Sequence, residues 1–293
     1  MFTFKRDRLM KKSLKKTVYN ILGPINYERL IGLKNLGYIP NINNPKKFNE
    51  KISRRKFQNN RDVIAQLSNK IQVRKYVAEK IGNESLTPLH GVYSSKISQN
   101  EYLALPDKFV LKSARGSGAN KFFDKSAHTI HDFNKFVSDN LNKEYLSTNN
   151  ELHYNETTDY IFAESLLKDD EHGIPYDFKF FVFHGKVKYI QVDMNRFDNH
   201  TRTFYDSKWN KQPFGLKFPA GKSIKKPCLL DEMILKAELL SEGFDFVRVD
   251  LYNINDEEII FGELTFMPGS GREKFYPSRW DLELGNLWLE VKP

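Results

Sequence analysis

The sequence predicts an α+β fold in which pairs of antiparallel strands alternate with helices. Apolar and polar residues alternate on both sides of His184-Gly185, which predicts a tight hairpin. Residues 248–271 predict a second pair of strands joined by a turn, and helical patterns occupy residues 129–146 and 231–241. Strand pairs interrupted by helices are typical of α+β proteins rather than of a doubly wound parallel sheet.

The other predicted elements follow one another along the chain. Met10, Leu14, Val18 and Ile21 recur at helical spacing with lysines between them, which predicts a basic amphipathic helix. A connector and a polar helix follow over residues 41–60. The remaining predictions are a helix over 61–82 that ends at Gly82, an extended segment over 87–93, a strand, glycine loop and strand over 108–123, and a buried strand over 159–167.

Composition excludes several classes of protein. The 293 residues are 40% hydrophobic and 14% aromatic, which fits a folded domain rather than a disordered chain. Cys228 is the single cysteine, so an internal disulfide and a zinc site built on several thiolates are excluded. Because the sequence shows neither a window of about 18 apolar residues nor the apolar core of a signal peptide, we expect a cytoplasmic protein.

The net charge of +9 is concentrated at the N-terminus. Residues 1–60 hold 15 Lys and Arg and three acids, which leaves 31 and 34 for the rest of the chain. Residues 1–22 could therefore lie on an anionic membrane surface as a peripheral contact, or pack on their own domain with a solvated basic face. Aromatic residues are not interleaved with these lysines as in nucleic-acid readers, so no nucleic-acid partner is expected.

Common catalytic motifs are absent from the sequence. The glycine loops at 116–121 and 269–274 fit neither the Walker pattern nor the GxGxxG pattern. His128 and His131 lack a third metal ligand, and no nucleophile elbow or Cys/His pair is found.

Charged residues on predicted strands suggest a phosphate and metal site instead. Lys112 precedes Gly116 by four residues, so its ammonium could meet phosphates beneath the glycine loop. Asp250 and Glu263 fall inside apolar strands, where an isolated carboxylate is costly, and Mg²⁺ is the positive partner that we expect between them. For each residue alone, a structural ion pair is the alternative.

In their order along the chain, the motifs resemble those of the ATP-grasp superfamily. The resemblance is to the branch linked to teichuronopeptide and other cell-surface polysaccharide biosynthesis. It rests on "NPKKFNEKI" (44–52), "LSNKIQVRKYV" (67–77), "FVLKSARGSG" (109–118), "YDFKFFVFHGKVKYIQVD" (176–193), "FVRVDLY" (246–252) and "FGELTFMPGSG" (261–271).

The resemblance implies an ATP-grasp fold, with two α+β lobes that grip ATP and a small N-terminal α/β domain before them. The implied boundaries are a basic N-terminal helical extension over residues 1–60, an N-terminal domain over 61–108, a lobe with the glycine loop over 109–165, and a lobe with the metal site over 166–293.

The resemblance also implies roles for individual residues, with ATP and Mg²⁺ as cofactors. Those toward ATP are Arg74 and Lys112 at the phosphates beneath Gly116, Ser117 and Gly118, Glu164 and Leu166 or Leu167 at the adenine, and Asp169 or Asp170 at the ribose. Those toward the reaction are Arg248 at the developing oxyanion, Lys179 as a neutralising cation, and Asp250 and Glu263 as magnesium ligands. Thr265 stands where the family commonly has Asn, so it implies fewer protein ligands for the second magnesium.

The implied reaction is the joining of a carboxylate to an amine through an acylphosphate. Candidate residues for the substrates are Asn195, Arg196, His200 and Arg202 on one polar, basic run, and Arg272. The implied small-molecule substrates, which could be glycan-linked, are an amino acid or peptide amine and a uronic acid. Two alternatives remain: a phosphotransferase acting on a sugar hydroxyl, and a non-catalytic protein that binds polyanions or a membrane surface through its basic N-terminus.

Overall fold

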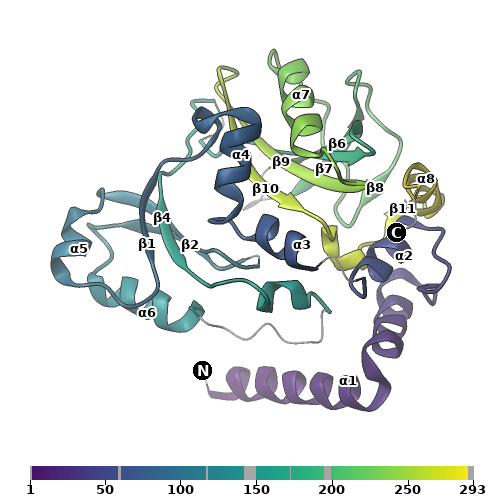
Figure 1. Ribbon diagram of the computed structural model, residues 1–293, viewed down its shortest axis with the longest axis horizontal. Coiled ribbons are helices and arrows are strands. Elements are labelled where there is room, and N and C mark those ends of the chain that lie inside the picture. The colour runs from purple at the N-terminus through teal and green to yellow at the C-terminus, as the bar shows by residue number, and fades with distance from the viewer. Residues whose placement is uncertain are drawn as a thin grey trace.

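Two antiparallel sheets form the body of the protein, one in each of two lobes (Figure 1). The computed structural model describes residues 2–58, 61–116, 118–141, 150–171, 173–194 and 199–289, with side chains from residue 13 onward except that of residue 61. We call the lobe with the four-stranded sheet lobe A and the lobe with the five-stranded sheet lobe B.

Lobe A consists of a four-stranded sheet and two helices. The strands run in the order β1-β4-β2-β3, and α5 and α6 supply Tyr102, Phe133 and Val137 to a core shared with Phe109 and Phe123 of the sheet. The elements are β1 (Leu89–Tyr93), α5 (Gln99–Ala104), β2 (Lys108–Ser113), β3 (Asn120–Asp124), α6 (Ile130–Asn140), the 3₁₀ turn η3 (Leu152–Asn155) and β4 (Ile161–Glu164).

Lobe B holds a five-stranded sheet that is covered on both faces. Along β5, Phe178, Phe180 and Val182 pack on the side of α4 and α7, whereas Phe181 and Phe183 pack on the side of α2 and α8. The strand order is β10-β9-β5-β6-β7. The elements are β5 (Asp177–Phe183), β6 (Lys186–Met194), β7 (Thr201–Asp206), β8 (Gly215–Leu216), α7 (Leu230–Leu240), β9 (Phe246–Ile254), β10 (Glu258–Thr265), the turn η4 (Pro268–Gly271), β11 (Phe275–Tyr276) and α8 (Arg279–Leu287).

The two predicted hairpins are confirmed. His184 and Gly185 both have positive φ, 49° and 74°, as the two-residue turn between β5 and β6 requires. Strands β9 and β10 pair in antiparallel register, and the turn between them places Asn255 and Asp256 at positive φ. The strand, glycine loop and strand over 108–123 form β2 and β3.

The single helix predicted over 61–82 is wrong, because two helices cover this range. α3 (Arg61–Ser68) ends before Asn69, and α4 (Val73–Ile81) starts after it. The Asn69 amide oxygen accepts hydrogen bonds from the backbone N–H groups of Ile71 and Gln72, at 3.0 and 3.2 Å. These bonds form a side-chain turn at Asn69 that separates the two helices. The helix predicted over 129–146 forms α6 as far as Asn140, and residues 142–149 lie outside the described residues.

Residues 61–108 do not form the separate domain that was expected. Helix α4 packs with lobe B, while β1 pairs with β4 of lobe A, after the short 3₁₀ turn η1 (Asn83–Ser85). The chain therefore crosses between the lobes at residues 86–88, and it crosses back at 165–176. The two crossings adjoin each other, since the Ser165 N–H donates to the Pro88 carbonyl at 3.0 Å.

The N-terminal extension predicted over residues 1–60 is shorter in the structure. Helix α1 (Phe2–Leu36) bends at Gly23, whose φ is 72°, and its first half projects from the body (Figure 1). α2 (Phe48–Arg55), by contrast, buries Phe48 and Ile52 in the core of lobe B. Only the part before the bend stands apart from the lobes.

A buried charge network holds the second half of α1. Glu28 is 0% exposed and pairs with Lys56 at 2.8 Å and with Arg272 at 2.6 Å, and it accepts a hydrogen bond from Asn150. Burial lowers the pKa of Lys56 to about 8 although Glu28 opposes this effect. Two cations thus depend on one carboxylate that has no access to water.

We expect Glu28→Gln to lower the free energy of unfolding by about 3 to 5 kcal/mol, because Lys56 and Arg272 would lose their buried counterion. Urea titration followed by circular dichroism measures this loss. The control is Glu79→Gln, which removes an exposed pair with Lys75 at 3.9 Å and should change stability by less than about 1 kcal/mol. Equal effects of the two substitutions would contradict the role of the network.

The first half of α1 is exposed, as the predicted membrane contact requires, and the contact itself stays a prediction. Leu14 and Ile21 are 66% and 77% exposed, and they lie seven residues apart on one helical face with Lys15 and Lys16 nearby. No helix among the described residues combines the length and apolarity needed to cross a bilayer.

Deleting residues 2–22 should weaken binding to vesicles that contain phosphatidylglycerol, since each lysine near an anionic surface contributes about 1 kcal/mol. Co-sedimentation with these vesicles measures the effect, and neutral phosphatidylcholine vesicles are the control. Unchanged binding after the deletion would refute the membrane contact.

Candidate active site

A cleft of about 500 Å³ lies between the two lobes. This volume is typical of a small-molecule site. Its walls bring together most of the residues predicted for the site: Arg74, Lys112, Gly116, Gly118, Glu164 and Leu167 on one side, and Lys179, Arg202, Arg248, Asp250, Glu263 and Thr265 on the other.

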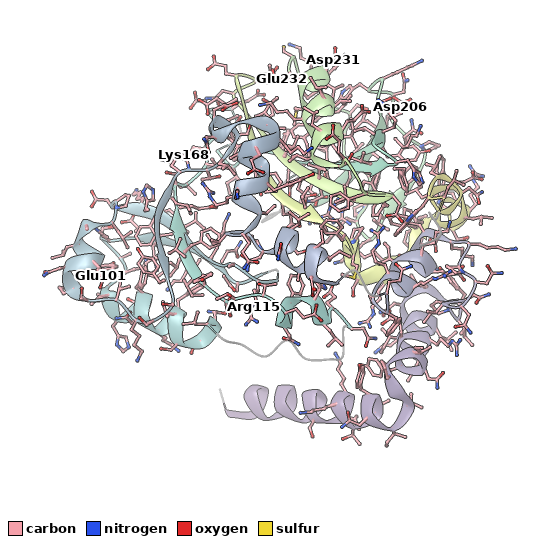
Figure 2. The ribbon with its side chains drawn as sticks, in the orientation of Figure 1. Glu101, Arg115, Lys168, Asp206, Asp231 and Glu232 are labelled. Carbon is pink, nitrogen blue, oxygen red and sulfur yellow. The ribbon has the colours of Figure 1, made fainter. Side chains whose placement is uncertain are left out.

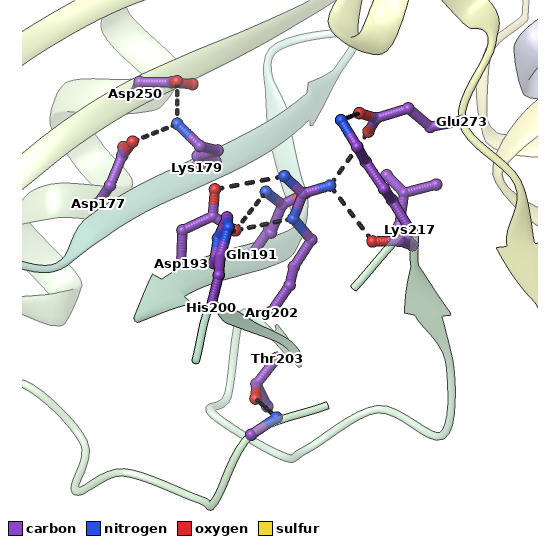
Figure 3. Close-up of polar contacts among 12 residues, drawn as sticks. Asp177, Lys179, Gln191, Asp193, His200, Arg202, Thr203, Lys217, Asp250 and Glu273 are labelled. Carbon is purple, nitrogen blue, oxygen red and sulfur yellow. Dashed lines mark hydrogen bonds and ion pairs between the residues drawn. The ribbon is translucent and has the colours of Figure 1, made fainter. Parts of the chain in front are cut away.

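Three neighbouring strands of lobe B carry a row of buried charges. In the sheet register, Lys179 of β5 is opposite Asp250 of β9, and Asp250 is opposite Glu263 of β10. The Lys179 ammonium lies between Asp177 and Asp250, and donates to each at 2.5 Å (Figure 3). One lysine therefore neutralises part of the charge of two carboxylates.

Arg248 connects Asp250 to Glu263. Its Nε and Nη2 each donate to Asp250 at 2.7 Å, and Nη2 also donates to Glu263 at 3.0 Å. Thr265 completes the set, because its hydroxyl accepts from Arg248 at 3.0 Å and donates to Glu263 at 2.7 Å. Arg248 and Lys179 thus supply part of the positive charge expected between the two acids, and Mg²⁺ as a further positive partner stays a prediction.

Their surroundings shift the pKa values of Asp250 and Glu263 in opposite directions. Burial raises the pKa of Asp250 to about 6, although Arg248 and Lys179 oppose the rise. Burial also disfavours the ionised form of Glu263, but attraction by Lys70, Arg248 and Lys179 outweighs it and holds the pKa at about 2. Both groups are ionised at pH 7, Glu263 more firmly.

Cations from lobe A and from the segment of α3 and α4 line the other side of the cleft. Lys112 forms an ion pair with Glu164 across β2 and β4, so these two predicted residues are direct neighbours. Arg74 of α4 donates to the Thr87 carbonyl at 2.9 Å. Lys70 donates to the Gly116 carbonyl at 2.5 Å, and burial lowers its pKa. Lys70 thereby holds the start of the glycine loop.

Arg115, the charged residue of the glycine loop, is directed away from the cleft. It forms a buried ion pair with Asp159 at 2.7 Å and donates to the Tyr154 carbonyl at 2.9 Å, beside η3 (Figure 2). The loop is therefore anchored through its arginine, while Gly116 and Gly118 line the cleft with positive φ.

A second charged group lies deeper in lobe B. Arg202 of β7 donates to Asp193 of β6 at 2.7 Å and to Glu273 at 3.0 Å, and Lys217 pairs with Glu273 at 3.0 Å (Figure 3). All but Lys217 line the cleft. This end of the cleft therefore presents two carboxylates and one guanidinium, with Lys217 behind Glu273.

Several predicted residues lie elsewhere. Arg272 is bound to Glu28, so its expected contact with substrate is not supported. Asp169 and Asp170 hydrogen-bond to Asn255 in the β9–β10 turn and are not among the cleft residues. His200 and Leu166 are also outside the lining; His200 packs on Phe218, with ring centroids 4.0 Å apart, and lies 3.6 Å from Asp193. Ser117, Asn195 and Arg196 lie outside the described residues.

Five charged cleft residues were not predicted: Lys70, Glu151, Asp177, Asp193 and Glu273. The sequence did contain a signal for Asp177, because it lies two residues from Lys179 and so on the same face of the predicted strand. Lys70 follows the turn residue Asn69, and Glu273 follows η4, so both are placed by local bends rather than by a periodic pattern.

Asp250 and Glu263 are suited to a hard cation. They face each other on adjacent strands, and 35% of the Glu263 side chain is exposed, against 3% for Asp250. Two carboxylates suit Mg²⁺, which commonly takes one or two protein carboxylates and completes its shell with water and phosphate oxygens. Among the described residues, no group of three or more acidic, histidine or cysteine side chains is placed to hold a metal ion.

Comparison with known families matches the TupA-like ATP-grasp family over residues 50–289. The chain belongs to this family. The match covers the glycine loop and both sides of the cleft, and confirms the ATP-grasp fold and the branch that the motifs resemble. A search of curated proteins finds no match.

Solved structures include distant similarities. A D-alanine–D-alanine ligase from Bacillus anthracis complexed with ATP is 11% identical, with a TM-score of 0.41 over 70% of this chain and 55% of that one. The D-cycloserine synthetase DcsG is 13% identical, with a TM-score of 0.45 over 77% and 70%. N5-carboxyaminoimidazole synthetase from Staphylococcus aureus complexed with ADP is 11% identical, with a TM-score of 0.41 over 71% of this chain and 46% of that one. The chain spans about half the length of the first of these.

We expect Lys179→Met to lower the free energy of unfolding by about 3 to 5 kcal/mol at pH 7.5, because Asp177 and Asp250 would lose their shared cation. The loss should shrink at pH 5. There Asp250, whose pKa burial already raises, takes up a proton and no longer requires a counterion.

Urea titrations at the two pH values test this. The control is Lys186→Met at the start of β6, where the side chain is 69% exposed and pairs with Glu238, so the change should be within about 1 kcal/mol. A loss in Lys179→Met that does not depend on pH would refute the explanation.

Proposed function

We propose that the protein is an ATP-dependent carboxylate–amine ligase that forms an amide through an acylphosphate. The proposed substrates are an amino acid or peptide amine and a uronic acid carboxylate, and the proposed setting is cell-surface polysaccharide biosynthesis. One observation carries the proposal: a single cleft joins a glycine loop with cations on one wall to a buried row of carboxylates and cations on the other.

The lobe A wall suits the nucleotide. Backbone N–H groups of a glycine loop can surround phosphate oxygens, and Lys112 and Arg74 add positive charge beside Gly116 and Gly118. Lys70 supports the proposal because its bond to the Gly116 carbonyl fixes the loop. Phe162 and Leu167 provide apolar surface on the same wall for the base.

The proposed reaction has two steps. A substrate carboxylate oxygen attacks the γ-phosphorus of ATP, so the bond to the β,γ-bridging oxygen breaks and ADP leaves. The amine nitrogen then attacks the acyl carbon, phosphate leaves with the carbon–oxygen bond electrons, and the nitrogen loses a proton. No side-chain nucleophile is required.

Electrostatic stabilisation would be the main contribution of the protein. The guanidinium of Arg248 is held by Asp250, Glu263 and Thr265, and it would stabilise the negative charge that develops on the acyl oxygen. Asp250 and Glu263 would hold Mg²⁺, which would neutralise phosphate charge when bound. Lys179 would hold both Asp177 and Asp250 in place.

The far end of the cleft suits the two co-substrates. Arg202 offers a guanidinium to the carboxylate, while Asp193 and Glu273 attract an incoming ammonium group. These opposite charges lie in direct contact, so substrates that carry both types of group could displace the internal pairs.

Titrating ATP with and without Mg²⁺ tests the nucleotide site. We expect magnesium-dependent binding that Lys112→Ala and Glu263→Gln each weaken by about tenfold or more, the loss of one charge-assisted contact. The controls lie on the same strands: Lys108→Ala on β2, which pairs with Asp124, and Glu258→Gln at the exposed start of β10. Calorimetry or thermal shift provides the measurement.

The outcomes separate the alternatives. Absence of nucleotide binding would refute both the ligase and the phosphotransferase. If ATP binds, incubation with uronic acids and amino acids should release ADP and phosphate together with an amide. ADP release with a phosphorylated sugar and no amide would instead show a phosphotransferase.

A further inference from the structure

A second hollow of about 590 Å³ lies next to the carboxylate end of the cleft. It is formed by residues 211–220 and Tyr276, and we call it the lysine–tyrosine groove. Lys211 and Lys217 supply its charge, and Tyr276 supplies an aromatic ring that is 57% exposed, with the Lys274 ammonium 5.6 Å from the ring centre.

The groove shares contacts with the cleft. Lys217 pairs with Glu273, which lines the cleft, and the Arg202 backbone N–H donates to the Pro219 carbonyl at 2.9 Å. The Arg202 guanidinium also lies 5.0 Å from the centre of the Phe218 ring. A chain-like molecule with one end at Arg202 would therefore meet the groove next.

The groove is held in place from below. Phe214 is buried and stacks on Trp280, with ring centroids 4.3 Å apart, and Gly215 pairs with Tyr276 in the β8–β11 ladder. The wall that carries Tyr276 is thus fixed before any ligand arrives, which lowers the cost of binding.

The segment that contains the groove carries charges of only one sign in its sequence. Between Asp206 and Asp231 the sequence contains six lysines and no acidic residue: Lys208, Lys211, Lys217, Lys222, Lys225 and Lys226. Such a surface attracts a polyanion.

We propose that the lysine–tyrosine groove binds the neighbouring units of an oligomeric acidic glycan whose terminal carboxylate lies at Arg202. The inference rests on the proposed function, because it assumes that the cleft takes a carboxylate substrate. Lysine ammonium groups pair with carboxylates, and a sugar ring packs on the exposed face of Tyr276.

Other polyanions fit the groove less well. Single-stranded nucleic acids require successive free aromatic faces, but Phe218 is already covered by His200 at 4.0 Å and by Arg202. An extended peptide commonly adds to a free strand edge, whereas β8 is paired with β11 and the segment beyond it is bonded to Arg202.

Binding of oligogalacturonate to the full chain, without nucleotide, tests the inference by calorimetry at low salt. We expect the oligomer to bind about tenfold more tightly than galacturonate, and Lys211→Glu and Tyr276→Ala each to remove most of that advantage. Monomer affinity should stay unchanged in both variants. The control is Lys222→Glu, which makes the same change in charge in the same segment but outside the groove.

Three results would overturn the inference: equal affinity for monomer and oligomer, an equal loss in Lys222→Glu and Lys211→Glu, or oligothymidylate or polyglutamate binding with the same dependence on Tyr276. Circular dichroism shows whether Tyr276→Ala folds, and Lys211→Gln provides a milder second variant. ATP titration on the same samples separates the two proposals. Oligomer binding without ATP binding would refute the ligase alone, and the reverse would refute the groove alone.

Discussion

A row of buried charges across β5, β9 and β10 determines much of the architecture of lobe B. Asp177, Lys179, Asp250, Arg248 and Glu263 alternate in sign. All except Glu263, which is 35% exposed, depend on their neighbours because burial removes most of the water that would otherwise solvate them. Such a row requires strands whose register cannot slip, since a shift of one residue would turn every charge to the opposite face. Apolar packing on both faces of β5 supplies that constraint.

The same row explains the threonine at position 265. An amide at this position would offer an oxygen to a metal, whereas the Thr265 hydroxyl both accepts from Arg248 and donates to Glu263. The hydroxyl therefore fixes the relative position of a cation and an anion. In this chain, the geometry of Glu263 is set by protein contacts before any ligand binds.

The sequence could predict whatever depends on local periodicity. Alternation around His184-Gly185 and within residues 248–265 determined the hairpins, and these in turn placed Asp250 opposite Glu263. Lys70, Asp193 and Glu273 could not be found in this way, because contacts with distant residues bring them to the cleft. The predicted boundary at residue 108 differs from the strand pairing for a similar reason: the partner of β1 is β4, about 70 residues farther along the chain. An arginine such as Arg272 is a residue type that commonly binds substrate carboxylates, but only the tertiary structure reveals its buried counterion Glu28.

The two crossings between the lobes limit how the lobes could move. Because residues 86–88 and 165–176 are joined by the bond from Ser165 to Pro88, the two covalent connections form one narrow strip rather than two separate supports. Two adjacent connections of this kind would form a single hinge, about which one lobe could rotate relative to the other but could not slide. Away from this axis, Lys70 and Asn69 bond to Gly116 and Thr157, so opening the cleft would first have to break these latch-like contacts at the glycine loop.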